Sequence, residues 1–244
     1  MHIPGSMSLL FLGCLLVLMP WIAIRSAALL REGRSETAAV PLPPRESIWA
    51  RTIVALGLLF VLAWYTGRGF GFQVFAVPAL GLREIVAAVA ALAICFGLRA
   101  ASRAMHSEAE RRGMVVYFLA PRTAREWLLW TAMVLVASVA EETAYRGVGM
   151  AVLWYSLGNP YAAAGVCAVA FALAHWTQGW KSAAVIFVIA LVMHGLVAFT
   201  GTLVLAMVVH AVYDLVAGYL IAQEAAGYDR EVTSLGPPAT IQSE

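Results

Sequence analysis

The fold of this chain is decided by one charged stretch, Ala140-Glu141-Glu142-Thr143-Ala144-Tyr145-Arg146-Gly147, at the end of the apolar run 127–140. An ionised acid at the bilayer centre costs roughly 2.5–3.5 kcal/mol, so two adjacent carboxylates there need partners. Glu142 and Arg146 are four residues apart and share a helix face, whereas Glu141 points about 100° away. We interpret Glu142–Arg146 as a structural pair and Glu141 as the acid free for chemistry. In the alternative, all three form a buried network without chemistry.

The composition outside this stretch is that of an integral membrane protein. Of the 244 residues, 62% are hydrophobic and 12% are charged, whereas soluble domains carry about 25% charged residues. Fifteen of the sixteen basic residues are Arg, and most lie in two connecting segments, 25–51 and 99–125. We expect membrane lipid and a membrane-associated protein or peptide as partners, and no nucleic acid. The composition does not indicate an oligomeric state.

Apolar runs predict an all-α, polytopic membrane helix bundle with about seven or eight transmembrane helices. The candidate spans are 9–24, 52–66, 85–98, 126–155, 161–176, 183–199 and 203–222. A helix over 126–155 would be about 45 Å long, too long for one straight span, so we expect a kink at Gly147 or Gly149. The positive-inside rule places the two basic connectors and the C-terminus in the cytoplasm, with the chain in the inner (plasma) membrane.

Further polar residues interrupt the later spans. His175 closes the run 171–176, and His210 and Asp214 share a helix face because they are four residues apart. Asp214 either orients the imidazole or faces a common ligand beside it, as metal ligands do. We assign His194, which has no partner within a turn, to packing or a supporting role. Burying each of these polar side chains is costly. One site shared by Glu141, His175 and His210 is therefore a simpler explanation than three unrelated buried polar residues.

Such a site supports two kinds of chemistry. A carboxylate and two imidazoles can activate water by general-base catalysis and stabilise an oxyanion. Alternatively, they can bind a divalent cation that acidifies water. The residue types alone leave both alternatives open.

The order of three motifs resembles the CAAX protease and bacteriocin-processing (CPBP, or Abi) family of intramembrane endopeptidases. The motifs are Glu141-Glu142-x-x-x-Arg146, Phe171-x-x-x-His175 and His210-x-x-x-Asp214. Glu141, His175 and His210 are separated by 34 and 35 residues. The resemblance covers about 121–220. It suggests three regions: N-terminal transmembrane helices and basic connectors (1–120), a catalytic helical core (121–222), and a polar C-terminal tail (223–244) that we expect to be disordered at its end.

The resemblance implies a role for each motif residue. Glu141 and His175 would activate the water, His210 and residue 214 would stabilise the oxyanion, and Glu142 and Arg146 would support them. Several family members carry Asn where this chain has Asp214. Asn can donate to an oxyanion, whereas an ionised Asp only accepts. Asp214 must therefore be protonated, orient His210, or bind a metal.

The function that we favour is hydrolysis of a peptide bond in a membrane-associated protein or peptide, lipidated or not. Glutamate and histidine would activate the water, and no cofactor would be required. If a metal such as zinc takes part, its ligands would be Glu141, His175, His210 and Asp214. The alternative is a non-catalytic membrane immunity or assembly-partner protein that uses the same polar cluster for stability. Replacing Glu141 by Gln discriminates between the two classes.

Overall fold

The computed structural model describes residues 5–32, 43–76 and 80–234, and these residues form helices without any strand. Six of the described helices are long and apolar enough to cross a membrane. They comprise Ser6–Leu30, Arg45–Arg68, Leu82–Ala104, Ala124–Leu157, Trp180–Thr200 and Leu203–Arg230. A seventh apolar helix, Pro160–Ala174, is shorter. The predicted all-α polytopic bundle is therefore confirmed, with six long helices and one short one in the described part of the chain.

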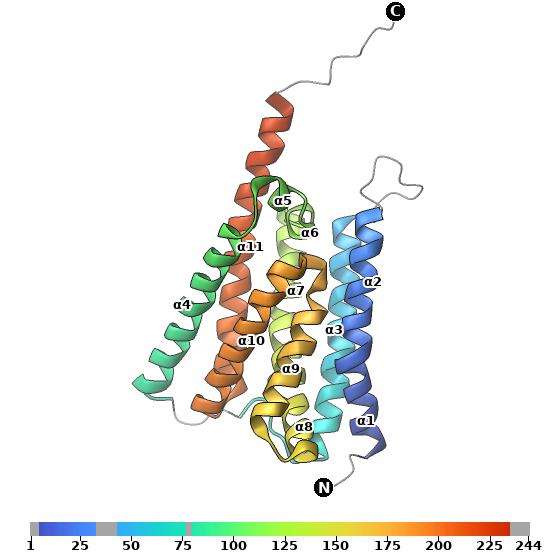
Figure 1. Ribbon diagram of the computed structural model, residues 1–244, viewed down its shortest axis with the longest axis vertical. Coiled ribbons are helices and arrows are strands. Elements are labelled where there is room, and N and C mark those ends of the chain that lie inside the picture. Colours follow the sequence, from blue (N-terminus) through green and yellow to red (C-terminus); the bar gives the residue numbers. More distant parts are fainter. Residues whose placement is uncertain (1–4, 33–42, 77–79, 235–244) are drawn as a thin grey trace, which may run out of the picture.

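The elements follow one another with few loops (Figure 1). In order, they are α1 (Ser6–Gly13), a π-helical turn (Cys14–Leu18), α2 (Met19–Glu32), α3 (Arg45–Arg68), α4 (Leu82–Ala104), α5 (Glu108–Arg112), α6 (Val115–Phe118), α7 (Ala124–Glu141), a π-helical segment (Glu142–Gly149), α8 (Met150–Leu157), α9 (Pro160–Ala174), a 3-10 turn (Trp176–Gln178), α10 (Trp180–Thr200) and α11 (Leu203–Ser234).

Three boundaries differ from the sequence-based prediction. α2 continues to Glu32 and α3 begins at Arg45, so both ends of the predicted loop 25–51 are helical, and 33–42 lie outside the described residues. α11 continues beyond Ala222 to Ser234, because Glu224 is bound by side chains of the preceding connector. The expectation of a disordered end falls on 235–244, outside the described part of the chain.

The turn between α8 and α9 falls in the gap between the predicted spans 126–155 and 161–176. Gly158 ends α8 in the left-handed region with φ 68°, a conformation that glycine adopts without steric cost. The side chain of Asn159 accepts hydrogen bonds from the backbone N–H groups of Tyr161 and Ala162, and Pro160 occupies the first turn of α9. This combination of cap and proline starts α9 immediately after α8 ends.

The core is centred on the charged stretch and is rich in small residues. Ala140 and Ala144 are completely buried, together with Ala63 of α3 and Ala168 of α9. Alanine lets membrane helices approach closely, which favours van der Waals packing between them. α3 packs on α7, α9 on α10, and α11 on both α4 and α7. The motif is thus held at the centre of the bundle.

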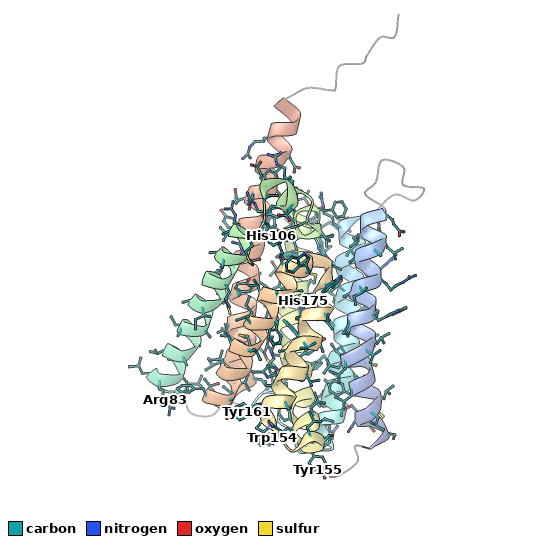
Figure 2. All side chains as sticks on the ribbon, in the orientation of Figure 1. Arg83, His106, Trp154, Tyr155, Tyr161 and His175 are labelled. Carbon is teal, nitrogen blue, oxygen red and sulfur yellow. The ribbon has the colours of Figure 1, made fainter. Side chains whose placement is uncertain are left out.

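The two ends of the bundle differ in character (Figures 1 and 2). One end, which we call the connector end, carries α5, α6 and the last turns of α11. Figure 2 shows His106 and His175 toward this end, whereas Arg83, Trp154, Tyr155 and Tyr161 lie at the other end. The exposed aromatic rings there match the belt that Trp and Tyr form at membrane interfaces.

Candidate active site

Most of the charged stretch, from Glu142 to Gly147, lies in the π-helical segment Glu142–Gly149 between α7 and α8, and all residues of this segment are buried. We predicted an irregularity at Gly147 or Gly149, but the π-helix begins at Glu142 and includes most of the motif. Gly149 makes this geometry possible, since an added Cβ would lie 2.5 Å from the carbonyl oxygen of Ala144 and 2.7 Å from Cδ2 of Leu15. Such wide turns occur frequently at functional sites.

Glu142 and Arg146 form the predicted pair inside this segment. Nη1 of Arg146 lies 3.2 Å from Oε1 of Glu142, and the two side chains are 1% and 0% exposed. The guanidinium carbon of Arg146 lies 4.1 Å from the ring centroid of Phe171, a cation–π contact. Oε1 of Glu142 also accepts a hydrogen bond of 2.8 Å from Nδ1 of His210. The pair therefore connects the first motif to both of the others.

The imidazole of His210 lies among three carboxylates. Its Nδ1 donates to Glu142, because a carboxylate oxygen can only accept. Its Nε2 lies 3.4 Å from Oδ2 of Asp214 and 3.8 Å from Oε2 of Glu141. The contact with Asp214 is the one expected if this residue orients the ring. Glu142 thus determines which ring nitrogen faces the other two acids.

His175 lies at the C-cap of α9 rather than inside a span, with φ −99° and ψ 15°. Its Nδ1 lies 2.8 Å from the carbonyl oxygen of Phe171. A carbonyl oxygen only accepts, so Nδ1 carries the proton, and Nε2 of the neutral ring keeps its lone pair. The ring centroid of Phe171 lies 4.5 Å from that of His175 and 6.4 Å from that of His210. Phe171 therefore packs against both imidazoles.

A cavity of about 400 Å³ reaches from the π-helical segment toward the connector end. The four residues that sequence reasoning named as catalytic all line it, as do the two residues of the supporting pair: Glu141, His175, His210, Asp214, Glu142 and Arg146. The side chains of Glu141 and Asp214 are 14% and 34% exposed, so water reaches both acids. The structure brings the whole predicted set together, and the catalytic role of each member stays a prediction.

Some residues that line or shape the cavity wall belong to none of the sequence motifs. Trp49 of α3 and Trp130 of α7 stand edge to face, with ring centroids 6.2 Å apart, and both line the cavity. Gly218 of α11 lets Trp130 approach, since an added Cβ would lie 2.7 Å from its indole. These residues are 80 or more positions apart in sequence. Tryptophan in an apolar run is common, so no local pattern marks these positions as parts of one wall.

The arrangement of side chains bears on the metal alternative. In residues 5–32, 43–76 and 80–234, no group of three or more His, Cys, Asp or Glu side chains is placed so that it could hold a metal ion. The four proposed ligands therefore do not form a metal site in this conformation, and we derive no catalytic step through a metal.

Comparison with known proteins gives one match. Residues 123–216 match the family model of the type II CAAX prenyl endopeptidases, Rce1-like. This segment begins at the N-cap of α7, contains the three motifs, and ends two residues after Asp214. The comparisons with curated proteins and with solved structures find no match. With its multiple apolar helices, the chain is a multi-pass membrane protein whose residues 123–216 form a Rce1-like domain, similar to the type II CAAX prenyl endopeptidases.

Proposed function

We propose that the protein is an intramembrane endopeptidase that cleaves a membrane-docked or lipidated protein or peptide. One observation carries this proposal: Glu141, the imidazole of His175 and the imidazole of His210 line a single cavity in the bundle. The Rce1-like domain supports an endopeptidase in general. The residues in the cavity support the particular mechanism that follows.

Water would be activated between Glu141 and His175. Glu141 or Nε2 of His175 takes a proton from water while the oxygen attacks the carbonyl carbon of the scissile peptide bond. Negative charge then develops on the former carbonyl oxygen, and a proton on Nε2 of His210 would stabilise it. Collapse of the tetrahedral intermediate breaks the C–N bond, and the proton taken from water passes to the leaving amine. Two separate products result, one with a new carboxylate and one with a new amine.

Substitution of Glu141 tests this proposal. Glu141→Gln keeps the shape of the side chain but removes the base, so it should abolish cleavage of a membrane-anchored peptide pool in nanodiscs and leave the folded yield unchanged. Glu84→Gln is the matched control, because Glu84 only caps the N-terminus of α4. Full activity of Glu141→Gln would refute the mechanism. Absence of cleavage by the wild type would favour the non-catalytic immunity or assembly-partner function.

A second substitution tests whether the reaction needs a metal. We propose that it does not, because a carboxylate and an imidazole can together activate water. In that case Asp214→Asn supplies a neutral donor near the oxyanion, and activity should persist or rise. If zinc takes part, Asp214→Asn removes an anionic ligand, so metal content and activity should both fall and added zinc should partly restore them. A tightly bound zinc, together with loss of wild-type activity to a chelator, would overturn the metal-free mechanism.

We further propose that the connector end faces the cytoplasm of an inner (plasma) membrane. Arg45 at the start of α3, the second Arg-rich connector, Lys181 and the end of α11 belong to this end, and basic residues concentrate on the cytoplasmic side. A cysteine-free background makes the test possible. An impermeant thiol reagent applied to intact cells should label Tyr161→Cys but not Trp180→Cys. Both positions are exposed; Tyr161 lies at the other end (Figure 2), whereas Trp180 precedes Lys181, which bonds Glu110 of α5 at the connector end. The reverse pattern would invert the orientation.

A further inference from the structure

The basic side chains that line the cavity are not equivalent. Arg146 is paired with Glu142 at its base. Near the connector end, Arg103 and Arg111 lie 2.9 Å and 3.2 Å from the same carboxylate oxygen. That oxygen belongs to Glu224, which also accepts hydrogen bonds from Tyr117 and Tyr228. These arginines are therefore occupied by partners within the protein.

Arg99 is the exception among the arginines that line this cavity in the described part of the chain. Its half-buried side chain lines the cavity, and it has neither a hydrogen bond nor an ion pair with any described residue. Tyr213, which precedes Asp214 on α11, lines the same cavity. A half-buried guanidinium without a partner in the protein is free to form charge-assisted hydrogen bonds to an anion that enters the cavity.

The position of Arg99 on α4 relates it to the catalytic residues. Cys95, four residues earlier, is buried and lines the same cavity as Glu142, Arg146 and Asp214. Four residues of helix correspond to about 6 Å along the axis and roughly one turn, so Arg99 lies on the same face of α4. Arg99 is thus one helical turn from the level of the charged cluster, toward the connector end.

We propose that Arg99 is a specificity-determining residue that binds a carboxylate of the substrate peptide. This inference rests on the proposed endopeptidase function. The planar guanidinium matches a carboxylate with two parallel hydrogen bonds. The carboxylate is either the C-terminus of the peptide or an Asp or Glu side chain near the cleaved bond. Bound there, it would hold the peptide across the cavity in one direction and limit which bond reaches Glu141.

The surroundings of Arg99 favour a peptide over a lipid headgroup. Only 11% of the membrane-spanning window of α4 is buried, so most of this helix faces the outside of the bundle. Arg99 instead is one of the few α4 residues that line the cavity, as are Cys95 and Ser102. An arginine that served phosphate headgroups would be expected on the outer face, where it can extend along the helix to the membrane surface.

The experiment uses the full chain in nanodiscs and three palmitoylated peptide pools that contain no other Asp or Glu. The first pool has a free C-terminus, the second is amidated, and the third is amidated with one internal Asp. Arg99→Gln should raise KM about tenfold or more for the preferred carboxylate-bearing pool, with kcat nearly unchanged and the amidated pool unaffected. Arg83→Gln is the matched control, because Arg83 stacks on Phe199 at the other end of α4.

Binding of the same pools to Glu141→Gln separates this inference from the proposed function. One outcome is that the wild type cleaves none of the pools. In that case, the role of Arg99 is still supported if Glu141→Gln binds a carboxylate-bearing pool more tightly than the amidated pool and Glu141→Gln/Arg99→Gln does not. Equal binding of the three pools, or a preference that survives Arg99→Gln, would overturn it. So would an effect of Arg99→Gln that appears only in nanodiscs of anionic lipid, because that result assigns Arg99 to lipid headgroups.

Discussion

Truncation of Arg146 offers the sharpest test of how the charged stretch is stabilised. Arg146→Ala removes the cation 3.2 Å from Glu142 and leaves a completely buried carboxylate with His210 as its remaining partner. Breaking a buried ion pair on one side costs about 3–5 kcal/mol. Loss of the contact with the ring of Phe171 adds to this cost. For a chain of this size, about 3–5 kcal/mol corresponds to a fall in Tm of roughly 6–20 °C.

The buried cysteines of the protein supply the assay. Cys95 and Cys167 are 1% and 0% exposed, so a thiol-reactive dye reports their exposure as the detergent-solubilised protein is heated. Arg146→Ala should show the lower Tm, whereas Glu141→Gln should melt with the wild type. Arg125→Gln is a matched control, because the side chain of Arg125 is 80% exposed and its pair with Glu46 is screened by water.

A double substitution makes the reasoning refutable. Arg146→Ala/Glu142→Gln removes the uncompensated charge as well, and a glutamine oxygen can still accept the hydrogen bond from Nδ1 of His210. The double variant should therefore be more stable than Arg146→Ala alone. A double variant that melts no higher than the single one, or an Arg146→Ala variant within about 2 °C of wild type, would show that the pair does not stabilise the fold.

Two further predictions follow from the helices. Gly149→Ala should destabilise the protein by about 1–3 kcal/mol in the same thermal assay, because its Cβ would clash with Ala144; Gly165→Ala, with nothing within 4 Å, should not. The hydrogen bond from Lys181 lowers the pKa of Glu110 to about 2. At pH values above the ordinary glutamate pKa of 4.5, this link should therefore hold α5 in place. It should be lost as the pH falls toward 2. Pepsin cleavage within 108–118 should increase as the pH is lowered from 4.5 to about 2. In Lys181→Met, which lacks the donor to Glu110, cleavage should already be high at pH 4.5. Cleavage that is equal at both ends of the window in the wild type would contradict the link.

Much of the architecture could be predicted because its causes are local. Runs of apolar residues identify membrane helices wherever they occur, and Gly158, Asn159 and Pro160 end one helix and start the next through their own conformational preferences. The resemblance to a protease family also depends on local patterns, since each motif lies within one helical turn or two. The helix ends at Arg45 and Ser234 were predicted less well, because Arg45 bonds Phe118 and Glu126, and Glu224 of α11 bonds Arg103 and Tyr117.

The sequence by itself therefore determined the membrane bundle, the Glu142–Arg146 spacing and the set of polar residues that needs a shared site. Only the tertiary structure decided that Glu142 also holds His210, that Phe171 packs against His210 as well as His175, and that Arg99 lines the cavity without a partner among the described residues. The physical reason is that these relations join helices 30 or more residues apart. Periodicity describes which face of one helix a residue occupies, whereas the packing of several helices decides which faces meet.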